Sequence, residues 1–344
     1  MFKSRTPKML DEKGEVLENS VSILEPVQIA GIKQWILVRG EDQNCPLLLF
    51  LHGGPGSAQV GFIRKYEQAL EKHFIVVNWD QRGAGKSGRK VDPSTMNLAQ
   101  MVEDTNELIT YLLSRFGKRT LFLAGHSWGS ILGVLTTQKY PENITSYIGI
   151  SQLVNMELNE QISYDYAVQR AQEAGHQKAI AALSKIGRPP YSNFKAMMKQ
   201  RKWLIKFIPM ELSSDYLLRA ILSSTEYTLV DWYFFAKNIL ISNQLLWDEF
   251  MNVNLFEEVP QLSVPVYLCE GRHDYQAPFE LAIQYIEKLN APQKRIFWFE
   301  DSGHSPHISE PKQFSEICLH IKNTYKTESR KEIKPEVLVH QKSR

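Results

Sequence analysis

Cysteine is scarce in this chain, and its scarcity excludes two classes of protein. Only three cysteines occur among 344 residues, and they stand far apart at Cys45, Cys269 and Cys318. An odd number of widely separated thiols does not make the framework of a disulfide-rich fold. None has the short spacing to other ligands that a zinc site requires. The sequence therefore predicts a protein without structural disulfides, without a metal and without another cofactor.

The chain also lacks a strong charge of either sign and any long apolar run. Its 40 lysines and arginines nearly balance its 38 aspartates and glutamates, which leaves a formal net charge of +2. No basic stripe with interleaved aromatic residues occurs, so a nucleic-acid partner is not expected. No apolar run is long enough to cross a bilayer, and the first residues lack the apolar segment of a signal peptide. We expect a cytoplasmic protein without a membrane partner, and the sequence indicates no particular oligomeric state.

What the chain does contain is an alternation of short apolar runs with helical patterns. The run 46–51 is almost wholly apolar, which is typical of a strand covered on both faces. Segments 22–29 and 34–38, separated by Ala30-Gly31, predict a hairpin. Strands that alternate with helices favour an α/β protein with a mostly parallel, doubly wound sheet. Further strands are expected at 74–79, 120–124, 146–150, 264–269 and 295–299, and helices at 60–72, 96–116, 130–139, 278–289 and 310–325.

This alternation stops between residues 155 and 256, where the pattern is helical and rich in aromatic residues. Two predicted strands of the sheet bracket the segment, so we expect a helical cap inserted above the strand ends. Most of its aromatic side chains are expected to pack inside that helical layer. The predicted organisation is a first part of the core at 20–152, a cap at 153–260, a second part of the core at 261–325 and a charged tail at 326–344, disordered or loosely docked.

The stretch Gly125-His126-Ser127-Trp128-Gly129 lies between a predicted strand and a predicted helix. A serine between two glycines at such a turn is the pattern of a nucleophile elbow. The serine must adopt a strained backbone conformation there, and glycine on either side avoids a clash. Although a simple Ser/Gly turn would also fit the five residues alone, the strand and helix around them favour Ser127 as a nucleophile.

The partners that such a nucleophile needs follow two later strands. Asp274 follows the predicted strand 264–269, and His304 follows the last predicted strand. Because sites in open α/β sheets form beyond the carboxyl ends of the strands, these side chains can converge on Ser127. A histidine accepts the serine proton, and a buried carboxylate orients the histidine. Taken alone, Asp274 could cap a helix, and His273 and His307 compete as the base, but only His304 stands between two small residues.

An oxyanion hole requires two backbone N–H groups near the nucleophile. We expect one from Trp128, which follows Ser127, and the other from Gly54 in the turn His52-Gly53-Gly54-Pro55-Gly56. An ordinary strand exit is the simpler interpretation of that turn, but five such residues at the required place argue against it. Gly85-Lys86-Ser87 matches the end of a phosphate loop, yet the glycine that this motif needs five residues earlier is Asp80.

Taken together, these motifs resemble the proline iminopeptidase family of α/β hydrolases over about residues 20–325. The resemblance implies an α/β-hydrolase fold with a helical cap, no metal, and a serine aminopeptidase that releases N-terminal proline or another small residue from peptides. Typical members carry Gly-Gly-Ser-Trp-Gly at the elbow, whereas this chain has His126 at the second position, which puts a narrow proline specificity in doubt. The matching segments are 52–56, 79–87, 125–129, 271–274 and 302–304.

Other functions fit the same residues. An esterase, a lactonase or another hydrolase of small acyl compounds would use the same triad, and a non-catalytic ligand receptor could share the fold but would not need all three groups. Epoxide hydrolases and dehalogenases require aspartate in place of Ser127. An aminopeptidase also needs a cap carboxylate for the substrate's free amine, and we favour Glu226 among the acidic residues of the cap. The others are Glu157, Glu160, Glu173, Glu211, Asp215 and Asp231.

Overall fold

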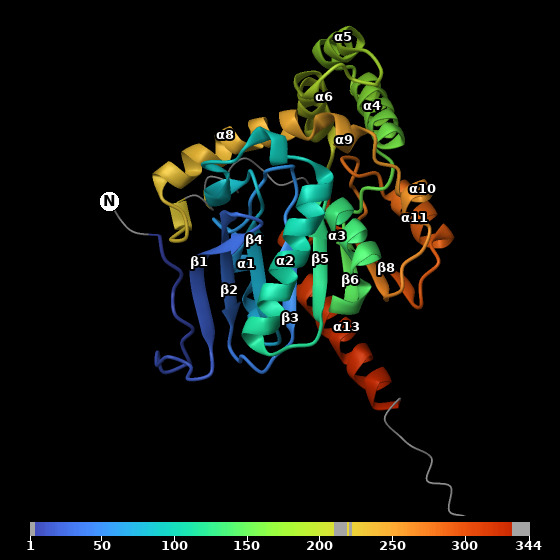
Figure 1. The fold of residues 1–344 in the computed structure, drawn as a ribbon. Helices are drawn as coiled ribbons and strands as arrows, with labels where there is room; N and C mark the ends of the chain where they lie inside the picture. The colour runs from blue at the N-terminus through green and yellow to red at the C-terminus, as the bar shows by residue number, and fades with distance from the viewer. Residues whose placement is uncertain (1–3, 210–218, 220–221, 332–344) are drawn as a thin grey trace, which may run out of the picture.

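The computed structural model describes residues 4–209, 219 and 222–331 of the chain. Within them, eight strands form one sheet in the order β1-β2-β4-β3-β5-β6-β7-β8 (Figure 1). β2 is antiparallel to both of its neighbours, and the remaining pairs are parallel. The predicted α/β class and mostly parallel sheet are thus confirmed. The strands are β1 (Val21–Ile29), β2 (Ile32–Gly40), β3 (Leu47–Leu51), β4 (Ile75–Asp80), β5 (Leu121–His126), β6 (Ile144–Ile150), β7 (Val266–Gly271) and β8 (Lys294–Phe299).

Helices cover both faces of this sheet, and β3 shows why its sequence is apolar throughout. Leu47, Leu49 and Leu51 pack into the larger core with α2 (Leu98–Phe116), α3 (Trp128–Lys139) and α11 (Phe279–Lys288). The alternate residues Leu48 and Phe50 pack on the other face, against α1 (Arg64–Glu71) and α13 (Pro311–Lys331). Since successive side chains of a strand point to opposite faces, a strand buried on both sides carries no polar alternation.

The segment between β6 and β7 forms the helices above the sheet. Asn155 accepts a hydrogen bond from the Leu158 N–H at 2.9 Å and so caps the first of them. A reciprocal pair of bonds between Thr228 and Asp231 begins α8. Figure 1 shows α4, α5 and α6 standing beyond one end of the sheet, with α8 lying across that end. These helices are α4 (Met156–Glu173), α5 (Gln177–Ile186), α6 (Phe194–Phe207), α8 (Leu229–Leu245), α9 (Trp247–Met251) and α10 (Leu255–Glu258).

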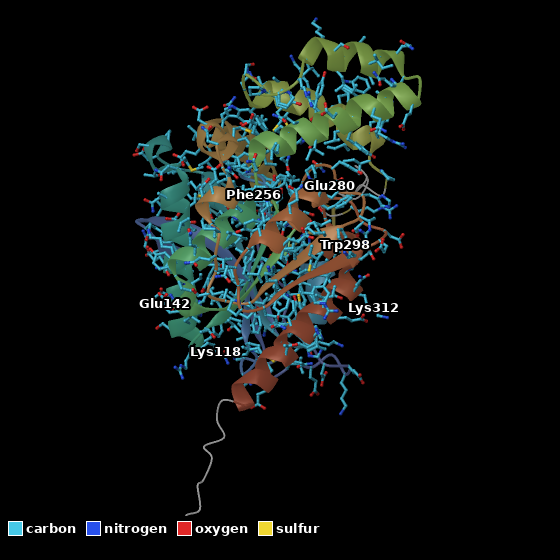
Figure 2. The ribbon with its side chains drawn as sticks, turned by 90° about the vertical axis from the view of Figure 1, so that its right-hand side faces the viewer. Lys118, Glu142, Phe256, Glu280, Trp298 and Lys312 are labelled. Atoms are coloured by element: carbon cyan, nitrogen blue, oxygen red, sulfur yellow. The ribbon has the colours of Figure 1, made fainter. Side chains whose placement is uncertain are left out.

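The cap lies at the carboxyl ends of the parallel strands. Lys118, which precedes β5, lies at the end of the molecule away from the cap helices (Figure 2). The carboxyl end of β5, where Ser127 follows, therefore faces the cap. Parallel strands deliver the residues that follow them to the same edge of a sheet.

Some element boundaries differ from the predictions. The helix expected at 60–72 begins only at Arg64, and the closing helix continues to Lys331 rather than ending near residue 325. A short helix, α12 (Pro306–Ser309), precedes α13, and short 3₁₀ helices occur at Gly85–Gly88, Pro93–Thr95 and Pro141–Asn143. Residues 332–344 of the predicted tail lie outside the described part of the chain. Within the described part, no helix is both long and apolar enough to cross a membrane.

Candidate active site

Ser127 lies at a sharp turn between β5 and α3, and its backbone has a φ of +53°. Few residues other than glycine adopt this conformation, which costs on the order of 1–3 kcal/mol and concentrates at functional sites. The two flanking glycines are required by packing. A Cβ at Gly125 would overlap the carbonyl oxygen of Gly129, and a Cβ at Gly129 would overlap that of Leu51. The turn therefore has the geometry that the sequence pattern predicts.

The structure brings Ser127, His304 and Asp274 together. The His304 Nε2 lies 2.9 Å from the Ser127 Oγ, and the His304 Nδ1 lies 2.9 Å from the Asp274 Oδ2. The second carboxylate oxygen of Asp274 accepts the N–H groups of Gln276 and Ala277, each at 2.9 Å. Asp274 is fully buried, and the chain of contacts allows a proton to pass from the serine to the imidazole.

The pKa of Asp274 results from opposed effects. Burial raises it, but the neighbouring His304 and the hydrogen bonds from His304 and the Ala277 N–H lower it by more, so the net pKa is below the usual value. The carboxylate therefore stays ionised at neutral pH, as an imidazolium partner requires.

The two competing histidines do not occupy the place of the base. His307 is buried, its Nε2 lies 3.4 Å from the Gln59 Nε2, and its ring packs against His126 at 4.6 Å between centroids. Among the described residues, the His273 ring makes no hydrogen bond to Ser127 or Asp274. Only His304 contacts both.

Two backbone donors are free where the oxyanion hole was predicted. Trp128 is the first residue of α3, so its N–H has no partner inside the helix. Gly54 lines the cavity beside Ser127 with a φ of +125°. Within the described residues, no acceptor contacts either N–H.

His126 has a role in the site that sequence reasoning missed. Its Nε2 lies 2.7 Å from the carbonyl oxygen of His304, and the Ser151 hydroxyl donates to the same oxygen at 3.0 Å. Burial first, and the nearby His304 second, lower the pKa of His126 to about 3, although the bond to the His304 carbonyl acts in the opposite direction. The ring is therefore neutral, and its single proton must lie on Nε2 to make this bond. The departure from glycine at position 126 was the available signal.

A cavity of about 530 Å³ opens beside the triad, between the core and the cap. Most of its wall is apolar, and α6 and α8 both contribute to it. Glu160 of α4 and Arg201 of α6 also line it and form a buried ion pair through the Glu160 Oε1. The Glu160 Oε2 has no partner among the described residues. The apolar side chains are Phe62, Leu153, Met156, Phe194, Met197, Met198, Ile205, Phe235, Ile239, Leu240, Phe250 and Ile308.

The preference for Glu226 as the cap carboxylate is wrong. Glu226 is buried against Arg64, whose Nε lies 2.7 Å from its Oε1, and it does not line the cavity. Asp231 pairs with Lys86 and Arg89. Of the other acidic residues considered, Glu157 and Glu173 are exposed, Glu160 lines the cavity, and Glu211 and Asp215 lie outside the described residues.

Fold and sequence together define an α/β hydrolase. The family model of the alpha/beta hydrolase fold matches residues 46–178, which include β3, the elbow and α3. The chain resembles the crystal structure of a proline iminopeptidase-related protein from Thermus thermophilus with a TM-score of 0.60. That likeness has 19% identity and covers 88% of this chain and 97% of the other, so it concerns the fold alone.

Sequence relatives narrow the class to one group. The chain is 36% identical over 310 residues to the protein named "Probable aminopeptidase YbaC" of Bacillus subtilis (strain 168), covering 87% of this chain and 95% of that protein. It is 26% identical over 274 residues to the proline iminopeptidase of Clostridium botulinum (strain Hall), covering 78% of this chain and 87% of that protein. The chain therefore belongs to the proline iminopeptidase-like α/β hydrolases.

Proposed function

We propose that this protein is a serine aminopeptidase that cleaves the first residue from peptides through a covalent acyl-enzyme. The observation that carries the proposal is the continuous contact from the Ser127 Oγ through His304 to Asp274, at 2.9 Å for each step. Relatives named as aminopeptidases and proline iminopeptidases support the class of substrate.

In the proposed reaction, the Ser127 oxygen attacks the carbonyl carbon of the first peptide bond while its proton passes to the His304 Nε2. The carbonyl oxygen becomes negative, and the N–H groups of Gly54 and Trp128 stabilise it. The tetrahedral intermediate then breaks its C–N bond, and the imidazolium gives its proton to the leaving amine. A water molecule, deprotonated by the same imidazole, then attacks the acyl carbon. The C–O bond to Ser127 breaks as the imidazolium returns its proton to the Ser127 oxygen, and the free amino acid is released. Asp274 stabilises the imidazolium in both halves.

Glu160 is the residue we propose to bind the free amine of the substrate. It lines the cavity from the cap, it is fully buried, and its Oε2 lacks a partner within the described residues. An ammonium group that leaves water needs a carboxylate in compensation. The apolar wall around it would receive the side chain of the first residue.

A hydrolase of neutral acyl compounds, such as an esterase or lactonase, is the second candidate. One observation favours it: Arg201 already pairs with Glu160 and leaves this part of the wall without net charge. A neutral acyl chain could then fill the apolar cavity with no amine to be bound. The two candidates share the triad and differ only in what the cavity recognises.

The nucleophile is tested by Ser127→Ala together with a fluorophosphonate that labels reactive serines. We expect the variant to fold and to lose turnover by several orders of magnitude, as triad removals do. The probe should label the wild-type protein once, at Ser127. A second assay separates the aminopeptidase from the esterase or lactonase. It compares arylamides of proline, alanine and leucine with their N-acetylated forms and with short acyl esters. An aminopeptidase must reject the acetylated forms. Labelling at another residue, or a variant that keeps most of its rate, would contradict the proposed triad.

A further inference from the structure

The fully buried side chains of the cap helix α8 are polar, unlike those of an ordinary surface helix. Its buried residues include Asn238, Ser242 and Asn243, whereas its apolar residues Leu229 and Tyr233 are exposed. A surface helix normally turns apolar side chains inward. In α8, the inward polar side chains serve to hydrogen-bond the backbone of core loops.

Each of these three side chains donates to one carbonyl of a loop at the carboxyl ends of the strands. The Ser242 hydroxyl donates to the Gly83 carbonyl at 2.8 Å, and the Asn238 Nδ2 donates to the Gly85 carbonyl at 3.0 Å. Both acceptors belong to the loop after β4. Asn243 differs, because its Nδ2 donates to the carbonyl oxygen of Pro55 at 2.7 Å. Pro55 directly follows Gly54, the proposed oxyanion donor.

The Asn243 amide is held in one orientation. Its second amide hydrogen is directed at the carbonyl oxygen of Ile239, one turn earlier in α8, at 2.8 Å. The loop that it holds is itself a tight turn, closed by a hydrogen bond from the Ser57 N–H to the Gly53 carbonyl at 3.2 Å. A donor held by its own helix thus fixes this short loop at the Pro55 carbonyl.

We propose that Asn243 is a positioning residue for the oxyanion hole, and that the cap thereby contributes to transition-state stabilisation. This inference rests on the proposed function. By fixing the Pro55 carbonyl, Asn243 fixes the loop that carries the Gly54 N–H. An oxyanion donor is effective only when it already lies about 2.7–3.1 Å from the position of the negative oxygen. Without the Asn243 bond, the loop can move. The Gly54 N–H must then be brought into position during the reaction, which raises the barrier.

Asn243→Ala and Asn238→Ala form a matched pair for the test. Both residues are buried on α8, and both donate Nδ2–H to a loop carbonyl, but only Asn243 holds the Gly54 loop. We expect Asn243→Ala to lower kcat at least tenfold, with a much smaller change in KM. It should also weaken binding of an aminoalkyl boronic acid, which forms a tetrahedral adduct with the serine, by a similar factor. Asn238→Ala should leave both values within about threefold of the wild type.

Asn243→Asp is the second variant, because it keeps the size of the side chain and removes its donors. It should reproduce the losses of kcat and of boronic acid affinity that are expected for Asn243→Ala. If the alanine variant does not fold, kcat and boronic acid affinity of Asn243→Asp test the positioning role instead. Equal effects of the Asn243 and Asn238 variants, or an unchanged kcat and boronate affinity in the Asn243 variants, would overturn the positioning role. Failure of the proposed function is distinguishable, since it appears in the wild type as absent labelling of Ser127.

Discussion

Single residues of this protein take their roles from where the fold places them, and two glutamates of the cap illustrate this. Glu160 and Glu226 are both buried, and each pairs with an arginine. Glu226 pairs with Arg64 of the core and so joins the cap to the core. Glu160 pairs with Arg201 within the cap and lines the cavity, and its Oε2 has no hydrogen-bond partner among the described residues. Only the second arrangement offers a substrate amine an acceptor.

Replacement of the two glutamates separates these roles. Glu160→Gln should raise KM for a free-amine arylamide tenfold or more, because a buried ammonium then loses its counter-charge. The same variant should change KM for a short acyl ester much less. Glu226→Gln serves as the control and should leave both KM values nearly unchanged. The measurement is steady-state kinetics on both substrates, with circular dichroism to verify folding, and equal effects of the two variants would exclude Glu160 as the amine site.

The residues that could be predicted from the sequence are those set by local rules. Ser127 is identified by the glycines two residues before and two residues after it, and Asp274 and His304 follow the ends of strands that are themselves recognisable as apolar runs. Glu160 could not be singled out, because its place beside the cavity depends on how α4 packs against α6. His126 was noticed only as a departure from a pattern, since its contact to the His304 carbonyl joins segments 178 residues apart.

At the scale of elements, the approach of α3 to β3 sets the geometry of the elbow. The first turn of α3 lies so close to the end of β3 that a Cβ at Gly129 would overlap the Leu51 backbone. Further along α3, a Cβ at Gly133 would lie 2.5 Å from the Cε2 of Tyr147, which is a side chain. The backbone of a central strand cannot move without disturbing the sheet, whereas a small shift of the Tyr147 side chain leaves the strand backbone in place.

Gly129→Ala should therefore be more damaging than Gly133→Ala. We expect Gly133→Ala to cost about 1–3 kcal/mol, the usual cost of overpacking, and Gly129→Ala to cost more and to abolish turnover. Urea unfolding midpoints and labelling of Ser127 by the fluorophosphonate provide the measurements. A Gly129→Ala protein that is as stable and as readily labelled as the wild type would show that α3 can move away from β3.

The strands and the ends of α2, α3 and α11 were predicted within about two residues, but the start of α1 and the end of α13 were not. The helix expected to begin at residue 60 begins at Arg64, and a Cβ at Gly61 would lie 2.9 Å from the Tyr227 ring of the cap. That close approach joins parts of the chain that no local pattern relates. The closing helix was expected to end near Tyr325, yet its backbone continues to Lys331 through residues that include lysine, glutamate and arginine, which have high helix propensity.

At the scale of the whole molecule, two buried acids link stability to pH. Burial raises the pKa of Glu67 to about 8, against a smaller opposite effect of the hydrogen bond from Asn78. Burial likewise raises the pKa of Asp80 to about 7, although Tyr227 and the Lys86 N–H donate to it. Each acid binds its proton more tightly in the folded than in the unfolded protein. Their contribution to the free energy of unfolding is therefore fully present below about pH 4 and is lost as the pH rises toward 8.

Urea unfolding at several pH values tests this dependence. Between about pH 5 and pH 8, each of these acids that titrates should lower the free energy of unfolding by up to about 1.4 kcal/mol per pH unit. Glu67→Gln carries no titrating group at this position, so its stability should fall less steeply. Glu173→Gln, at an exposed position of α4, is the control and should follow the wild type. Parallel slopes for the wild type and Glu67→Gln would mean that Glu67 is ionised in the folded protein.

The insertion of the cap between β6 and β7 also sets the order in which a ribosome makes the site. β5 and Ser127 leave the ribosome first, the entire cap follows, and only then do β7 with Asp274 and β8 with His304 add to the outer edge of the sheet. At about 5–20 residues per second, this interval is on the order of ten seconds. A nascent chain thus holds a serine without a base until its last strand is made. In the proposed mechanism, a truncated translation product is an inert protein and not an unregulated hydrolase.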